Sequence, residues 1–293
     1  ISTSRFLVST NAEVIEPATG AGRVLAMTHA QATASDRSIG DYIRDWRQHR
    51  RFSQLSLALE IELSQKHLSF IESGRSIPSR EVVLRIAAGL GVPLRIRNLM
   101  LLAAGYAPVY QERRLDHPDM EAARAAVGRV LKAYEPYPAV AVDRRWNLVA
   151  SNDATMPLFA AVADAELLKP PVNVLRASLH PKGIAPLILN FEEWSGDILR
   201  RLSVQLEASG DPEIAELMNE LRELTGIAPG HEGRDEHGGV FVPLKLQLRG
   251  GVASFISTTT VFGTPTEITL SELVIEAFLP ADAETAALLA AMG

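Results

Sequence analysis

The chain contains no cysteine in its 293 residues. This absence excludes a disulfide scaffold, a Cys-ligated zinc site and a thiol nucleophile, and it is typical of a reducing compartment. No stretch approaches the roughly 18 uninterrupted apolar residues of a membrane-spanning helix. Residues 1–36 also lack the basic leader and apolar core of a secretory signal. We therefore expect a cytoplasmic protein with no membrane partner.

Motifs that carry catalysis are missing as well. The seven histidines are scattered, and only His231 and His237 approach metal-ligand spacing, in a loop rich in Gly and charge. The sequence has no HExxH, no Gly-rich phosphate loop followed by Lys, and no G-x-S-x-G elbow. We expect no catalytic residues, no metal and no cofactor. A hydrolase using Ser, His and Asp of the C-terminal part is an alternative that rests on composition alone.

Charge is distributed unevenly along the chain. The net charge is −6, yet residues 37–106 hold eleven Lys and Arg against six Asp and Glu, a local net charge of +5. Residues 107–293 carry a net charge of −10. A basic module joined to an acidic one is the pattern of a polyanion-binding domain with a non-binding partner domain.

Composition and periodicity divide the chain into three parts. Residues 1–36 are rich in Ser, Thr, Ala and Gly without a clear period, which predicts disorder. Residues 37–110 show five short helical patterns with brief links, which predicts an all-α domain. Three of these helices start at a serine that can cap them: Ser53, Ser64 and Ser79.

Residues 111–293 alternate between strand-like and helical patterns. Two strands, several helices and then three more strands predict an α+β domain with a mainly antiparallel sheet. A loop is expected at 228–239. The expected helices are 118–135, 152–163, 173–179, 191–208 and 211–224, and the expected strands are 139–143, 147–151, 241–249, 254–262 and 273–279.

The stretch from Phe52 to Pro93 resembles the helix-turn-helix of the Cro/λ-repressor type, the Xre family. The matching features are Ser53-Gln54, Leu57-Ala58, the cap Ser64, the inward pair Leu68 and Ile71, Glu72-x-Gly74 and Pro78-Ser79. Glu62 departs from the family, which usually has Gly at the sharp turn, and a left-handed backbone there is strained for Glu. The resemblance implies a five-helix λ-repressor-like domain that binds double-stranded DNA.

If Leu68 and Ile71 face the core, the opposite side of that helix is free to enter a major groove. Gln65 then suits adenine, Lys66 suits guanine acceptors and Phe70 suits a thymine methyl. Mere solvation of Gln65 and Lys66, and a packing role for Phe70, are the alternatives. Base-contacting candidates also include Ser69, and candidates at helix ends for phosphate contacts are Ser53, Gln54, Ser64, His67 and Arg75.

The resemblance also places Arg47 where a buried partner for Glu72 is expected, a structural role. A single module of this size reads a short site, so a homodimer on a pseudo-palindromic operator is expected. An interaction module without DNA specificity is the alternative, disfavoured by the 180 or so residues that follow.

From about residue 39 to the end, the chain looks like the MmyB-like regulators. The resemblance rests on 97–108, 135–139, 143–146, 173–176, His180-Pro181, 262–265 and 279–282. It implies a PAS-like sensor domain, with fatty-acid-like molecules as the ligand class.

The residue types in the C-terminal part of the chain are compatible with a ligand-binding cavity. Asn173 and Arg176 lie in an apolar helix, where Arg176 suits a carboxylate head group or pairs with a structural acid such as Asp153 or Glu193. An ordinary filled core is the alternative for the aromatic candidates, which are Phe159, Trp194, Phe255, Phe262 and Phe278.

Overall fold

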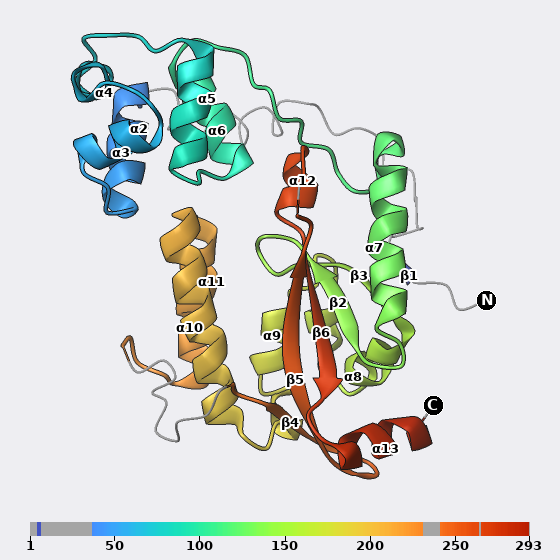
Figure 1. Cartoon of the computed structure of the whole chain (residues 1–293). Coiled ribbons are helices and arrows are strands. Elements are labelled where there is room, and N and C mark those ends of the chain that lie inside the picture. The colour runs from blue at the N-terminus through green and yellow to red at the C-terminus, as the bar shows by residue number, and fades with distance from the viewer. Residues whose placement is uncertain (1–4, 7–36, 231–240, 264, 293) are drawn as a thin grey trace, which may run out of the picture. The chain divides into compact units, whose positions relative to one another are not determined.

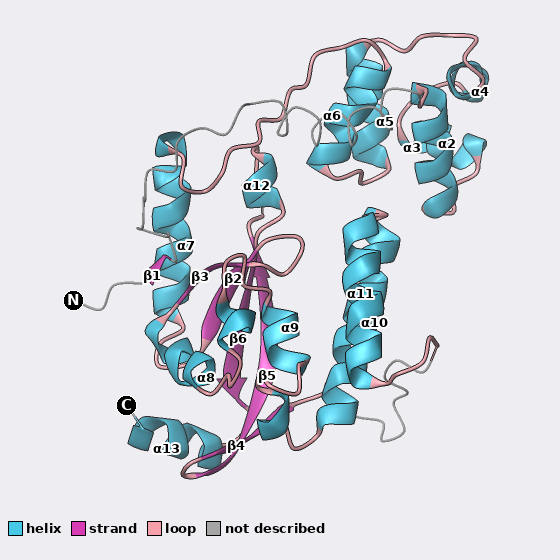
Figure 2. Ribbon diagram, turned by 180° about the vertical axis from the view of Figure 1, so that it is seen from behind, coloured by secondary structure: helices cyan, strands magenta, loops and turns pink. Residues whose placement is uncertain are grey.

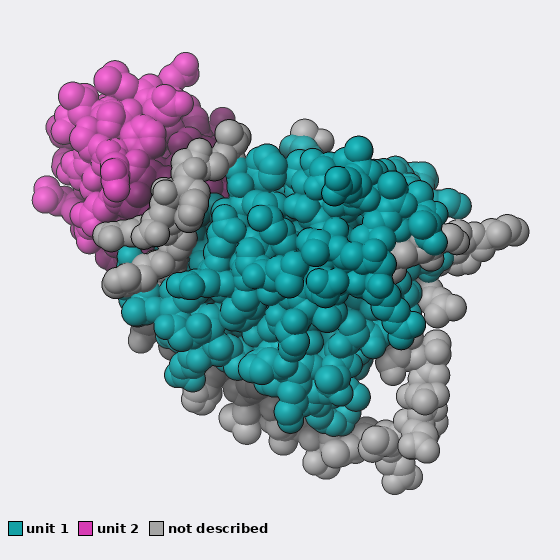
Figure 3. All heavy atoms as spheres, turned by 90° about the horizontal axis from the view of Figure 1, so that it is seen from below, with its two compact units in different colours: residues 1–8, 114–265, 269–293 teal, residues 9–113, 266–268 magenta. Residues whose placement is uncertain are grey.

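The computed structural model describes residues 5–6, 37–230, 241–263 and 265–292. They fall into two compact units (Figure 3): residues 9–113 with 266–268, and residues 1–8 with 114–265 and 269–293. Of residues 1–36 only Arg5 and Phe6 are described, and they form a short strand where disorder was predicted. The expectation for the rest of that segment lies outside the described residues.

From residue 37 on, where its description begins, the first unit is a bundle of five helices, as predicted (Figure 1). Its members are α2 (Ile39–His49), α3 (Gln54–Glu60), α4 (Gln65–Glu72), α5 (Arg80–Gly89) and α6 (Leu94–Ala103).

Serine side chains start four of these five helices. Ser38 and Asp41 form a capping box at α2, in which each side chain bonds the backbone N–H of the other. Ser53, Ser64 and Ser79 accept from a backbone N–H three residues on, at α3, α4 and α5. These bonds fix where each helix begins, and the predicted caps at these three serines are confirmed.

The core of the first unit follows the predicted periodicity. Side chains from all five helices meet in one apolar cluster. The fully buried members include Ile43 of α2, Leu57 of α3, Ile86 of α5 and Met100 of α6.

The second unit is built on one antiparallel sheet with the strand order β1-β3-β2-β6-β5-β4 (Figure 2). All neighbouring strands pair antiparallel, as predicted. The strands are β1 (Arg5–Phe6), β2 (Ala139–Val142), β3 (Leu148–Ser151), β4 (Leu244–Leu248), β5 (Gly251–Val261) and β6 (Val274–Pro280).

The helices of the second unit follow β1 in the sequence and lie before, between and after the other five strands. The hairpin of α10 and α11 is the longest helical element, and Gly210 joins its two helices in a left-handed conformation (φ 62°) that glycine adopts without strain. The helices are α7 (Glu121–Ala133), α8 (Met156–Ala160), α9 (Val174–Leu179), α10 (Phe191–Ser209), α11 (Pro212–Thr225), α12 (Ile268–Ser271) and α13 (Ala283–Met292).

Alternation along the strands gives the sheet two buried faces. On β2, Val140 and Val142 join the cluster that holds α9, α10 and α11, whereas Ala139 and Ala141 join the cluster that holds α7. Successive side chains of a strand point to opposite faces, so the period of two is the cause. The sheet therefore separates two apolar layers, and the layer with α9–α11 contains the pocket described below.

Candidate nucleic-acid interface and apolar pocket

Helix α4 is anchored from behind by two fully buried side chains. Leu68 and Ile71 have no exposed surface. The Ser64 hydroxyl accepts from the backbone N–H of His67 at 3.2 Å and so defines the start of the helix. Glu62, in the turn between α3 and α4, has φ 52°. The left-handed turn is therefore made without the glycine that suits it.

The opposite side of α4 is polar, basic and aromatic. Gln65 and Lys66 are exposed, and Ser69 and Phe70 are half-buried. Lys66 Nζ lies 5.7 Å, and Arg75 Cζ 5.4 Å, from the centre of the Phe70 ring. Cations at such distances are attracted by the negative face of an aromatic ring. Phe70 thus holds two cations beside each other on the outer side of this helix.

The candidates at helix ends divide into two groups. Ser53, Ser64 and Arg75 are exposed, and His67 is half-buried. Gln54 instead turns inward, because its amide donates to Glu72 Oε2 at 2.8 Å. Its side chain is therefore part of an internal network.

That network is centred on the buried carboxylate of Glu72. Arg47 donates to it through Nε (2.6 Å) and Nη2 (2.9 Å), and Arg44 donates to the Glu72 carbonyl at 2.5 Å. Burial alone raises the pKa of Glu72, but the bonds from Arg47 and Gln54 and the nearby positive charges outweigh burial and lower that pKa. The expected Arg47–Glu72 pair is confirmed, and it ties α2 to the end of α4.

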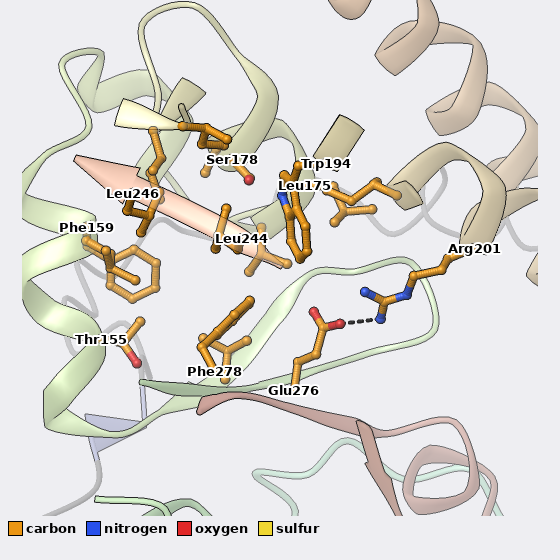
Figure 4. A pocket seen from close by; sticks show the side chains of 17 residues that line it. Thr155, Phe159, Leu175, Ser178, Trp194, Arg201, Leu244, Leu246, Glu276 and Phe278 are labelled. Atoms are coloured by element: carbon orange, nitrogen blue, oxygen red, sulfur yellow. Dashed lines mark hydrogen bonds and ion pairs between the residues drawn. The ribbon is translucent and has the colours of Figure 1, made fainter. Parts of the chain in front are cut away.

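The second unit contains a pocket lined almost entirely by apolar side chains (Figure 4). Its volume is about 70 Å3, several times the space that one buried water occupies. Strands β2, β4 and β6 and helices α8, α9 and α10 supply the lining. Leu158, Leu175, Ile198, Leu244 and Leu246 are among its members.

One ion pair lies at the wall of this pocket. Arg201 of α10 donates to Glu276 of β6, and Ser257 donates to the same Glu276 oxygen at 3.0 Å. The Glu276 side chain is 5% exposed and that of Arg201 is 25% exposed. The Arg201 guanidinium also lies 5.4 Å from the Trp146 ring. The carboxylate is thus held in place by two donors.

Sequence reasoning did not single out Arg201 or Glu276. An acid alone in the apolar strand Val274–Pro280 was the available signal. Its partner is 75 residues away in the sequence, so only the fold brings the two side chains together.

Three of the seven candidate ligand residues line this pocket: Phe159, Trp194 and Phe278. The others lie elsewhere. Phe255 is buried in the same apolar layer but outside the lining, and Phe262 packs against the layer on the α7 side. Aromatic residues on both faces of a strand look alike in the sequence, so the sequence could not separate them.

The two polar candidates have structural partners. Asn173 caps α9, where its side chain accepts from the Arg176 backbone N–H at 3.1 Å and donates to the Arg145 carbonyl at 2.8 Å. The Arg176 guanidinium forms a two-bonded pair with Glu220 of α11, both bonds being 2.7 Å. Neither residue belongs to the pocket lining. For Arg176 the structural-acid alternative fits, although the acid is Glu220 and not Asp153 or Glu193.

Two further features concern function. Within the part of the chain that the structure describes, no group of three or more acids and histidines could hold a metal ion. Across those same residues, no helix has both the length and the apolar character needed to cross a membrane.

The five-helix unit with a capped, outward-facing α4 defines a helix-turn-helix, and the second unit is a separate α+β domain with an apolar pocket. Residues 43–96 match the sequence model of the family described as helix-turn-helix. Residues 123–292 match that of the MmyB-like transcription regulator ligand binding domain, and the chain belongs to this family. The protein is therefore a DNA-binding transcription regulator with a ligand-binding domain.

A similarity to one characterised protein covers a shorter stretch. The chain is 31% identical over 64 residues to multiprotein-bridging factor 1 of Candida albicans. The match spans 22% of this chain and 42% of that protein.

Proposed function

We propose that the protein binds a pseudo-palindromic operator as a homodimer and reads it with α4 in the major groove. The observation that carries the proposal is the division of α4 into two sides. Leu68 and Ile71 are buried behind it, while Gln65 and Lys66 are exposed. An amide and an ammonium at the start of a helix are side chains that pair with adenine and guanine edges.

Contacts to the phosphate backbone come from side chains around α4. Ser53, Ser64 and Arg75 are exposed at helix ends, and Arg75 is stacked on Phe70 beside Lys66. Such contacts position a helix on the duplex but carry no sequence information. Ser69, His67 and Phe70, which are half-buried, contribute at the margin of the interface.

Base recognition is tested by replacing Gln65 and Lys66 with Ala, singly, in the full-length chain. The operator is first selected from random DNA, and affinities for operator and scrambled duplex are then compared. Each substitution weakens the operator complex by about 1–3 kcal/mol and leaves the scrambled complex nearly unchanged. Gln48→Ala, an exposed site on α2, is the control that changes neither. Equal weakening on both duplexes would remove α4 from the base-reading role.

The second unit then acts as a PAS-like sensor for a small hydrophobic, fatty-acid-like ligand held in the pocket. Phe159, Trp194 and Phe278 supply aromatic lining, and an apolar cavity suits an aliphatic chain. The ligand changes operator affinity only if it binds one domain arrangement better than another. Native mass spectrometry of the freshly purified protein tests the dimer and a retained ligand together.

A second candidate function is a helix-turn-helix that contacts proteins without DNA sequence preference. The similarity to a protein named as a bridging factor favours it. Equal affinity for selected and scrambled duplex, with the same salt dependence for both, would support this candidate over the first.

A further inference from the structure

Trp194 presents a buried donor that has no acceptor within the described part of the chain. The residue lies on α10, is 3% exposed and lines the pocket. Its indole Nε1–H makes no hydrogen bond with any residue that the structure describes. Figure 4 shows the indole among the lining side chains, with its nitrogen on the edge away from the Arg201–Glu276 pair. Buried donors are nearly always paired, so this one marks a place for an acceptor.

The other polar side chains of the lining are already engaged, apart from one hydroxyl. The single proton of the Thr155 hydroxyl is shared between the Ala139 carbonyl at 3.1 Å and Asn152 Oδ1 at 3.0 Å. Arg201 and Glu276 are bonded to each other. Ser178 lines the pocket, and no hydrogen bond of its hydroxyl is found among the described residues. The open hydrogen-bonding capacity of the lining side chains is therefore centred on Trp194 and Ser178.

The charge of the lining decides what kind of acceptor fits. Among the described residues that line the pocket, Arg201 is the only cation and Glu276 the only anion, so this lining carries no net charge. Glu276 is buried and is held by both Arg201 and Ser257. An anionic ligand in this apolar cavity would lack a free counter-charge and would face the Glu276 carboxylate. A neutral oxygen needs no counter-charge and is not repelled by the Glu276 carboxylate.

We propose that Trp194 Nε1–H recognises the ligand by donating to an uncharged oxygen, such as that of an ester, an alcohol or a protonated acid, on an aliphatic chain. This inference rests on the proposed ligand role of the pocket. It names Trp194 as the residue that determines head-group specificity. Ser178 adds a hydroxyl that can donate to or accept from the same group.

The first test compares octane, 1-octanol, methyl octanoate and octanoic acid on the full-length protein by isothermal titration calorimetry at pH 6 and pH 8. The alcohol and the ester bind with the same affinity at both pH values and about tenfold more tightly than octane. Octanoic acid, whose pKa lies below 5, binds about 100-fold more weakly at pH 8 than at pH 6, because its neutral fraction falls tenfold per pH unit.

The second test uses Trp194→Phe, with Trp146→Phe as the matched control. Trp146 is also buried, but its Nε1 donates to Gln205 at 2.9 Å and it does not line the pocket. Trp194→Phe weakens methyl octanoate about tenfold and leaves octane unchanged, whereas Trp146→Phe changes neither. Circular dichroism checks that both variants fold. If Trp194→Phe does not fold, the four-ligand comparison on the wild-type protein decides.

The possible outcomes distinguish the head-group inference from the underlying proposal that the pocket binds a ligand. Octanoate binding equally well at pH 6 and pH 8, or methyl octanoate binding no better than octane, overturns the head-group inference and keeps the pocket as a ligand site. Methyl octanoate binding that Trp194→Phe leaves unchanged does the same. Failure of all four compounds to bind overturns both the inference and the ligand role. DNA binding, measured separately, is untouched by either result.

Discussion

Arg47 and Glu72, 25 residues apart in the sequence, form a two-bonded ion pair that joins α2 to the last residue of α4. Their side chains are 12% and 3% exposed. Removing one member of such a pair leaves the other charge buried without compensation. The pair therefore stabilises the orientation of α4. Its loss is expected to lower the stability of the first unit, and any effect on DNA binding follows from that loss of stability.

Glu72→Gln is expected to lower the free energy of unfolding of the first unit by about 3–5 kcal/mol. Hydrogen exchange of peptides from residues 37–106, measured in the full-length protein, reports this unit by itself. Asp45→Asn on α2, the helix that carries Arg47, is the control, because Asp45 pairs with Arg37 at an exposed site and its loss costs below about 1 kcal/mol. Unchanged exchange in Glu72→Gln would contradict a supporting role.

The same carboxylate predicts how stability depends on pH. The pKa of Glu72 in the folded protein lies below its usual value of 4.5, so the folded state binds the proton more weakly than the unfolded state. Its contribution is present above pH 4.5 and is lost as the pH falls below that value toward the lowered pKa. Acid titration of wild type and Glu72→Gln checks the sign: the variant loses less stability between pH 5 and pH 3. A parallel loss in both proteins would exclude Glu72 as a cause.

Glu62→Gly is expected to stabilise the first unit. Glu62 is exposed and has φ 52°, where an ordinary residue is strained by roughly 1 kcal/mol and glycine is not. The gain, reduced by the greater freedom of glycine in the unfolded chain, is about 0.5 kcal/mol. Glu60→Gly, at the end of α3, is the control and destabilises by up to about 1 kcal/mol. Thermal unfolding followed by circular dichroism measures both, and a lowered melting temperature for Glu62→Gly would contradict the argument.

The sequence predicted the first unit well because its signals are local. Ser53, Ser64 and Ser79 cap helices whose inward residues recur at helical spacing, and each cap involves residues three positions apart. Strands β2 to β6 of the second unit were also predicted, because turn residues and alternation are local too, whereas β1 (Arg5–Phe6) lies in the segment for which disorder was predicted. Helix α13 was missed: its sequence, Ala283–Met292, is almost uniformly apolar and shows no period.

The pocket was predicted only in part because long-range pairing creates it. Strand β2 lies next to β6, with Val140 opposite Glu276, although more than 130 residues separate them in the sequence. No local pattern reveals that pairing. Trp194 and Phe278, which residue type singled out, line the pocket, but residue type could not show that Phe262 faces the other layer.

Arg75→Ala tests the electrostatic share of DNA binding. Arg75 is exposed and stacked on Phe70 at 5.4 Å, so its charge is held beside α4. Removal of a phosphate-binding cation at this position weakens operator and scrambled DNA alike and reduces the slope of log K against log salt by about 1. Arg114→Ala, which removes an 86% exposed cation from the second unit, is the matched control with no change in slope. Weakening confined to the operator would make Arg75 a base-reading residue.

Arg176→Ala separates a structural role from a ligand role. Arg176 and Glu220 are 43% and 42% exposed, and such a pair contributes about 0.2–1 kcal/mol to stability. We therefore expect a small loss of stability and unchanged affinity for methyl octanoate, since neither residue lines the pocket. Arg201→Ala gives the contrast: it strands the buried Glu276 carboxylate and costs about 3–5 kcal/mol. Calorimetry and thermal unfolding of the two variants check both effects. A marked loss of ligand affinity in Arg176→Ala, with thermal stability nearly unchanged, would indicate that Arg176 contacts the head group of the ligand directly. The ligand role of Arg176 would then replace the structural one.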